Sequence, residues 1–217
     1  MSEPLRRLPV YFLIDCSGGM HGEPIEAVRM GLRTLVEDLQ SEPQALETVY
    51  LSVITFASSA VQACPLTELA MFQVPYLTAG GARAMGEALC LLEKCIDLEV
   101  RKPLGDQKGD WKPLIFLLTD GVPTDNWEQA AESLRDRKLG RIIACAAGEG
   151  ADPELLRYIS SGDDNMVVQL KNLTPNQLQA FFNWISISVN STSLALAGPG
   201  PVGVGLPPTP PEVVVVP

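Results

Sequence analysis

Leu8-Pro9-Val10-Tyr11-Phe12-Leu13-Ile14-Asp15-Cys16-Ser17-Gly18-Gly19-Met20 is the segment of the chain that says most about its fold. Its run of apolar residues predicts a strand that is buried on both faces of a parallel sheet. A second apolar run, residues 114–119, ends at Asp120-Gly121. Ligands of open α/β sheets bind beyond the carboxyl ends of the strands, so we expect Asp15 and Asp120 to face one crevice. Carboxylate oxygens in such a place suit a hard divalent cation.

Strand and helix patterns alternate through most of the chain. Strands are predicted at residues 8–14, 49–56, 61–64, 114–119, 141–147 and 166–170. Helices are predicted at residues 24–40, 85–96, 125–138 and 153–159, with a closing helix from Thr174-Pro175. Asp125 and Glu128 form a plausible capping pair for the third of these helices. The alternation predicts an α/β fold, a Rossmann-like open, mostly parallel sheet with helices on both faces.

The composition changes near the C-terminus. We predict one domain at residues 1–190, followed by a Pro/Gly/Val-rich flexible tail at residues 191–217. Two functional alternatives for the tail remain open. The prolines of residues 207–211 are able to form a polyproline II segment, and the valines of residues 213–216 are able to add a strand to a sheet edge.

Charge and cysteine content narrow the class of protein. The net charge of −10 over 217 residues argues against partners that need a basic surface, so we expect neither nucleic-acid nor membrane binding. Five scattered cysteines show no paired spacing for a disulfide framework or a zinc site. With no signal-peptide pattern at the start, these features predict a cytoplasmic protein with reduced thiols.

Three motifs together resemble the von Willebrand factor type A (VWA) domain family. They are Asp15-x-Ser17-x-Gly19-Met20, Gly80-Gly81 before a helix, and Leu118-Thr119-Asp120-Gly121. In that family three such loops form the metal-ion-dependent adhesion site, where a partner carboxylate completes the coordination of the metal. The resemblance implies a non-catalytic protein-interaction module, with Asp15, Ser17 and Asp120 as metal ligands and Mg²⁺ or Mn²⁺ as the possible ion.

The chain departs from the family pattern at two ligand positions. Gly19 stands where the resemblance implies a second Ser, and Arg83 (or Ala82, in another alignment) stands where it implies a Thr. Loss of two hydroxyl donors predicts impaired metal binding, so we expect no resident cofactor. Three alternatives follow for Arg83: it pairs with Asp15 and Asp120 as a built-in cation, it points to solvent, or waters replace the lost donors in a working metal site.

Further stretches resemble the TerY-like subgroup of bacterial tellurium-resistance VWA proteins. These stretches are residues 46–56, 65–69, 108–114 and 181–184. The resemblance implies action with a protein kinase and a protein phosphatase in tellurium resistance or stress response. We expect the interaction face at the crevice formed by residues 15–22, 78–86 and 120–127, which we call the loop face. Partner contacts are expected there from Met20, His21, Arg83, Val122, Asp125 and Trp127.

Three of these residues also suit roles that involve no partner. His21 suits a solvated loop, Asp125 suits a helix cap, and Trp127 has helical spacing that favours core packing. An enzyme is the competing class, with Asp15 or Ser17 acting in hydrolysis or phosphoryl transfer. The chain has one histidine and lacks the G-x-S-x-G and P-loop patterns, which argues against that class.

Overall fold

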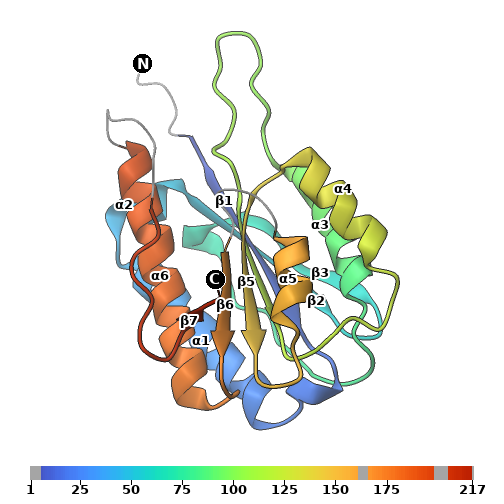
Figure 1. The fold of residues 1–217 in the computed structure, drawn as a ribbon. Helices are drawn as coiled ribbons and strands as arrows, with labels where there is room; N and C mark the ends of the chain where they lie inside the picture. Colours follow the sequence, from blue (N-terminus) through green and yellow to red (C-terminus); the bar gives the residue numbers. More distant parts are fainter. Residues whose placement is uncertain (1–5, 161–165, 198–204, 217) are drawn as a thin grey trace.

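A computed structural model describes residues 6–160, 166–197 and 205–216. In this part of the chain, a seven-stranded sheet of order β3-β2-β1-β4-β5-β6-β7 carries helices on both faces (Figure 1). The strands are β1 (Leu8–Asp15), β2 (Val49–Phe56), β3 (Ala60–Glu68), β4 (Leu114–Thr119), β5 (Arg141–Ala147), β6 (Met166–Leu170) and β7 (Val214–Val215). The five inner strands are parallel, while β3 and β7 are antiparallel edge strands. The predicted fold class is confirmed.

Six α-helices and two 3₁₀ turns connect the described strands. They are η1 (Gly18–Met20), α1 (Glu23–Gln40), α2 (Pro43–Thr48), η2 (Leu69–Met71), α3 (Met85–Glu99), α4 (Glu128–Arg137), α5 (Pro153–Ile159) and α6 (Pro175–Ala197). Pro24 near the start of α1 has the fixed φ that suits a first helical turn. The short helix α2 has no counterpart among the predicted elements, because six residues carry too little periodicity.

Side chains of the central strands alternate between two cores. Val10 and Phe12 of β1 belong to the core under α1 and α6, whereas Tyr11 and Leu13 belong to the core under α3, α4 and α5. All eight residues of β1 are buried, as expected for a strand with helices on both sides. This double burial explains the unbroken apolar run at the start of the sequence.

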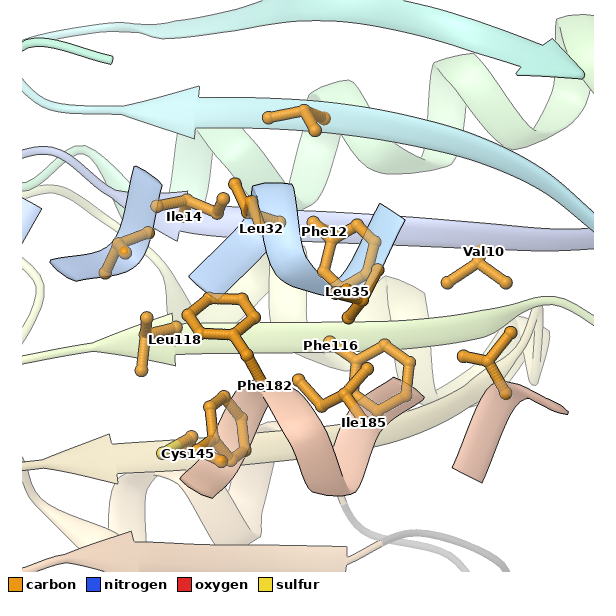
Figure 2. Packing of buried hydrophobic residues seen from close by; sticks show 14 of the residues in the cluster. Val10, Phe12, Ile14, Leu32, Leu35, Phe116, Leu118, Cys145, Phe182 and Ile185 are labelled. Carbon is orange, nitrogen blue, oxygen red and sulfur yellow. The ribbon is translucent and has the colours of Figure 1, made fainter. Parts of the chain in front are cut away.

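Helices α1 and α6 pack closely over one face of the sheet (Figure 2). The ring of Phe182 lies where a Cβ atom on Gly31 would stand, so glycine allows this close approach. Beneath the helices, Phe12 of β1 and Phe116 of β4 stack with ring centroids 5.5 Å apart. This contact joins β1 and β4, the two strands whose carboxyl ends carry the candidate site.

The strand order reverses direction between β1 and β4. From β1 the chain crosses to β2 on one side, and from β4 it crosses to β5 on the other side. The connecting loops therefore separate at the carboxyl ends of β1 and β4, which is the topological switch point of open α/β sheets. Asp15 is the last residue of β1, and Asp120 directly follows β4.

The flexible-tail prediction is wrong for the described part of the tail. The predicted boundary at residue 190 falls inside α6, which continues to Ala197. Val214 and Val215 pair with β6, and Val213 beside them is buried at 2 % exposure. The indole nitrogen of Trp184 donates to the Pro207 carbonyl oxygen at 3.1 Å. The tail pairs with the open edge of the sheet at β6 and contacts α6. The amino-acid composition of the tail does not reveal these contacts. Residues 198–204 and 217 of the predicted tail lie outside the described residues.

Asp125 caps a different helix from the one that the sequence predicts. Helix α4 begins at Glu128, and its N-cap residue is Trp127 rather than Asp125. The side chain of Trp127 makes no capping hydrogen bond. The Asp125 carboxylate accepts instead from the backbone N–H groups of Gly86 and Glu87, at 3.0 and 2.9 Å. These groups lie in the first turn of α3, whose own N-cap, Ala84, has no side-chain acceptor. The spacing along the chain could not show this cap, because its helix lies about forty residues away.

Candidate functional site

Asp15 is a fully buried carboxylate with hydrogen-bond donors on both oxygens. Its exposure is 0 %. Its Oδ1 accepts from the Ser17 backbone N–H at 2.8 Å, which forms a tight turn directly after β1. Its Oδ2 accepts from the Thr119 hydroxyl and from the Arg83 Nε–H, both at 2.6 Å. A buried charge needs such a complete set of partners, because an unpaired carboxylate would be costly there.

Thr119 is a site residue that the sequence reasoning missed. It is the last residue of β4 and is fully buried. Its hydroxyl also accepts from the Gly121 backbone N–H at 3.3 Å. Its position in an apolar strand concealed this role, but its place directly before Asp120 was an available signal.

Backbone hydrogen bonds join the three loops of the loop face. Gly18 donates to the Gly81 carbonyl oxygen at 3.0 Å, and Gly80 donates to the Cys16 carbonyl oxygen at 2.8 Å. Between the second and third loops, the Arg83 backbone N–H donates to the Thr124 hydroxyl at 2.9 Å. These bonds fix the backbone of Arg83 beside the ends of β1 and β4.

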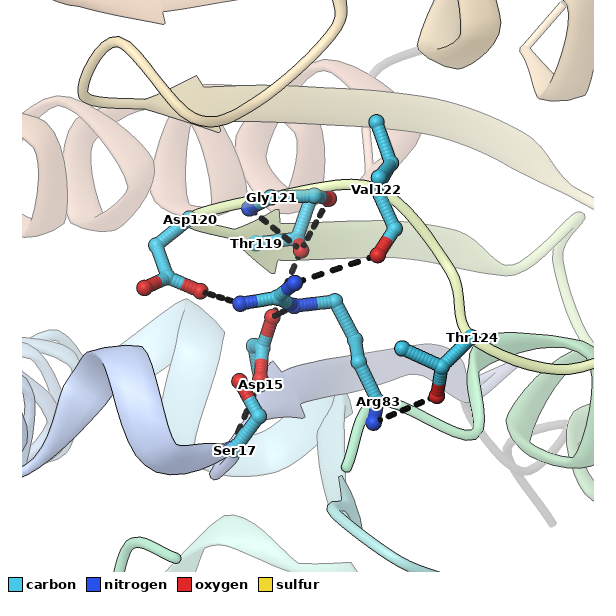
Figure 3. A network of polar contacts seen from close by, with 8 residues as sticks. All are labelled: Asp15, Ser17, Arg83, Thr119, Asp120, Gly121, Val122 and Thr124. Carbon is cyan, nitrogen blue, oxygen red and sulfur yellow. Dashed lines mark hydrogen bonds and ion pairs between the residues drawn. The ribbon is translucent and has the colours of Figure 1, made fainter. Parts of the chain in front are cut away.

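The Arg83 guanidinium lies between the two carboxylates (Figure 3). Its Nε donates to Asp15, one terminal nitrogen donates to Oδ1 of Asp120, and the other donates to the Val122 carbonyl oxygen at 3.1 Å. The Arg83 side chain is 15 % exposed, and that of Asp120 is 8 % exposed. Of the three alternatives stated for Arg83, the structure shows the one in which its side chain pairs with Asp15 and Asp120.

The pKa values of Arg83 and Asp120 are both shifted at this site. Desolvation alone would lower the pKa of the Arg83 guanidinium, but Asp15 and Asp120 outweigh it and raise that pKa. Burial raises the pKa of Asp120, and the negative charge of Asp15 adds to this effect against the opposing influence of Arg83. Two carboxylates therefore share one guanidinium, which remains charged.

Two glycines make room for this arrangement. An ideal Cβ atom on Gly19 would overlap the Asp120 carboxylate, and one on Gly121 would overlap the Arg83 guanidinium. Gly19 therefore does more than lack a hydroxyl. Its missing side chain leaves the space in which Asp120 turns toward Arg83.

The residues predicted to contact a partner divide into two groups. His21 is exposed, and Val122 is 47 % exposed. Met20 is fully buried, so the prediction that it contacts a partner is wrong; the 3₁₀ turn at residues 18–20 directs its side chain into the core under α1. Asp125 is engaged as the cap of α3.

Trp127 also belongs to the packed group. It is half-buried, packs on the core of α3 and α4, and meets the Tyr158 ring edge-on with centroids 5.7 Å apart. The Trp127 side chain therefore packs against the core and is not an exposed partner contact.

Comparison with known proteins identifies the family. The von Willebrand factor type A domain model matches residues 10–184. The chain belongs to this family. Inter-alpha-trypsin inhibitor heavy chain H2 of Sus scrofa is 25 % identical over 187 residues, which cover 82 % of this chain. The chain spans about a fifth of the length of the curated relatives that it matches.

Solved structures share the fold at low sequence identity. A von Willebrand factor type A protein from Catenulispora acidiphila has a TM-score of 0.62 at 18 % identity, covering 86 % of this chain and 43 % of its own. Proximal thread matrix protein 1 from the mussel byssus, solved with a zinc-occupied MIDAS motif, has a TM-score of 0.60 at 17 % identity, covering 86 % of this chain and 48 % of its own. No helix within the described ranges has the length and apolar character to cross a membrane.

The side chains at the loop face, as arranged, do not fit a divalent cation. The Arg83 guanidinium is hydrogen-bonded to both carboxylates that would ligate the ion, so a second cation would face like charge. Neither Gly19 nor Arg83 offers a hydroxyl, and the described residues contain no group of three or more His, Cys, Asp or Glu arranged for a metal. One trace of the family pattern remains in the Ser17 hydroxyl oxygen, which is buried and lacks a hydrogen-bond partner within the described residues.

Proposed function

We propose that this VWA domain is a non-catalytic protein-interaction module that binds its partner through the loop face without a resident metal. The observation that carries the proposal is the position of Arg83, which bonds to both Asp15 and Asp120. A guanidinium there supplies a fixed positive charge and stays protonated at any physiological pH. It offsets part of the charge of the two buried carboxylates, at the place where the family pattern has a metal.

The cellular setting that we propose follows the TerY-like resemblance of residues 46–56, 65–69, 108–114 and 181–184. In this setting the chain acts in the cytoplasm of a bacterium, with a protein kinase and a protein phosphatase, in tellurium resistance or stress response. The test is tellurite tolerance of a bacterial strain that lacks this chain. A plasmid copy of the wild type should restore tolerance, while an unchanged tolerance in the deleted strain would contradict this setting.

A metal-dependent adhesion module is the second candidate. The orphan hydroxyl of Ser17 favours it, because a buried oxygen without a partner is what an absent ion would leave. Proximal thread matrix protein 1, which shares the fold, was solved with zinc at this motif. In this alternative Arg83 swings out to solvent, and Mg²⁺ or Mn²⁺ binds Asp15, Ser17 and Asp120 with additional waters.

Thermal unfolding separates the two candidates. Wild type is compared with a Gly19→Ser/Arg83→Thr double variant, each in EDTA, Mg²⁺ and Mn²⁺. A ligand at one hundred times its Kd stabilises the native state by about 2.7 kcal/mol, which raises Tm by roughly 5–10 °C for a chain of this size. We expect no shift in wild type and a shift of this order in the double variant. A metal-dependent rise in the wild-type Tm would overturn the metal-free proposal and support the second candidate.

A further inference from the structure

We infer that the partner presents a basic side chain, Lys or Arg, to the loop face. This inference rests on the proposed function, and it assigns the chemistry of the partner group. It reverses the polarity of the family pattern, in which a partner carboxylate binds a metal.

The charge balance at the centre of the site favours a basic partner group. A divalent cation between two carboxylates gives a neutral centre that accepts a further carboxylate. Arg83 carries one positive charge between Asp15 and Asp120, so the centre keeps a net charge of about −1. All three guanidinium nitrogens already donate to oxygens of the same chain, two to these carboxylates and one to the Val122 carbonyl.

The second oxygen of the Asp120 carboxylate remains as an acceptor for a partner group. Arg83 bonds Oδ1 of Asp120, and the other oxygen of that carboxylate carries no bond in the network (Figure 3). This Oδ2 atom lies against the point where a Cβ on Gly19 would stand, and Gly19 itself is exposed. This oxygen therefore lies beside the exposed backbone of Gly19. An ammonium or guanidinium that approaches from this side would form a charge-assisted hydrogen bond with it.

The charge around the site is mostly negative. The loop at residues 148–152 borders the site, because a Cβ on Gly150 would contact the Asp120 carbonyl oxygen at 2.6 Å. Within residues 15–22, 78–86, 120–127 and 148–152, the sequence places one Arg, Arg83, no Lys, and one His, His21. The acidic residues of the same four segments are Asp15, Asp120, Asp125, Glu149 and Asp152. A field of this sign attracts basic groups and repels a partner carboxylate.

The probe for the test is a displayed library of random peptides in which acidic and basic residues are equally frequent. Peptides are selected on the folded wild-type chain, sequenced, and mapped by their effects on backbone amide NMR signals. We expect the selected peptides that perturb the loop face to be enriched in Lys and Arg. Their affinity should fall with rising salt, because the contact joins opposite charges.

Three substitutions then test the contact with the strongest peptide. Asp120→Asn keeps the shape and removes the charge, and should weaken binding about tenfold or more. Glu149→Gln, at an exposed position on the bordering loop, should weaken binding roughly two- to fivefold. Glu37→Gln, exposed near the far end of α1, is the matched control and should leave affinity unchanged. The Glu149 variant keeps the test valid if Asp120→Asn disturbs folding.

The outcomes distinguish this inference from the proposed function. Selected peptides that perturb the loop face but are rich in Asp and Glu, with affinity unaffected by Asp120→Asn, would overturn the basic-partner inference and leave the interaction module standing. A selection that yields no peptide perturbing the loop face would count against both.

Discussion

Gly19 and Asp120 share one space: the carboxylate of Asp120 fills the position that a Cβ atom on residue 19 would need. In this position Asp120 accepts from Arg83, which also bonds Asp15. The two departures from the family pattern, Gly19 and Arg83, are therefore physically linked. One makes room for the carboxylate, and the other holds it there.

Replacing the Gly19 hydrogen by a methyl group tests this link. Gly19→Ala should lower the free energy of unfolding by about 1–3 kcal/mol, because the new Cβ overlaps the Asp120 carboxylate. Gly18→Ala is the control, since its Cβ would meet only the Gly81 carbonyl oxygen at an ordinary 3.5 Å. The difference should shrink in an Arg83→Thr background, where Asp120 is free to turn away. Equal costs for the two alanines in urea denaturation would disprove the steric link.

Removing the built-in cation should be costly. Arg83→Met leaves Asp15, at 0 % exposure, and Asp120, at 8 %, without their shared positive charge. Breaking a buried pair from one side costs about 3–5 kcal/mol. The same change at Arg29, which pairs with an exposed Glu26, should cost less than about 1 kcal/mol.

A second substitution should return part of that stability. Asp120→Asn in the Arg83→Met background removes one of the two unbalanced charges, so the double variant should be more stable than Arg83→Met alone. If chemical denaturation shows the two effects simply adding, the charges are not coupled.

The Asp125 cap should stabilise the first turn of α3. Asp125→Ala should destabilise the chain by about 1 kcal/mol, because it removes the acceptor for the N–H groups of Gly86 and Glu87. Hydrogen exchange at these two amides should quicken. Asp136→Ala, at an exposed position on α4, serves as the control. Unchanged protection at Gly86 and Glu87 would show that the cap does not form in solution.

Two adjacent valines at the C-terminal strand should contribute differently to the free energy of unfolding. Val213 is 2 % exposed, whereas Val214 is 45 % exposed. Val213→Ala should lower the free energy of unfolding by about 2 kcal/mol through lost burial and a small cavity. Val214→Ala should change it by less than about 0.5 kcal/mol. Equal, small effects in thermal unfolding would mean that this segment does not pack on the domain.

Thiol reactivity reports on the end of β1. Burial, with a smaller contribution from the charge of Asp15, raises the pKa of Cys16 to about 12. A raised pKa favours the neutral thiol, so reactive thiolate forms only as the pH approaches that value. The native chain at pH 8 should therefore be labelled by maleimide at the exposed Cys90 and not at Cys16. Mass spectrometry of the peptides identifies the labelled residues, and rapid labelling of Cys16 would contradict its burial.

Local sequence patterns were sufficient to predict the sheet and the edge at which the site lies. Continuous apolar runs at residues 8–14 and 114–119 required strands covered on both faces, and parallel strands place Asp15 and Asp120 at the same edge. These features depend on local periodicity and on general rules of α/β topology. The local pattern also narrowed Arg83 to three alternatives.

The roles of the individual side chains at the site follow from the packing of the folded chain. Whether Arg83 reaches two carboxylates depends on the bonds that fix three loops far apart in the chain. The same holds for Asp125, which caps a helix about forty residues away, and for Val213, which packs on the core although composition predicted a flexible tail. Met20 likewise turns into the core although it lies in a loop. Contacts between distant segments depend on the packed geometry, which residue type and spacing along the chain do not specify.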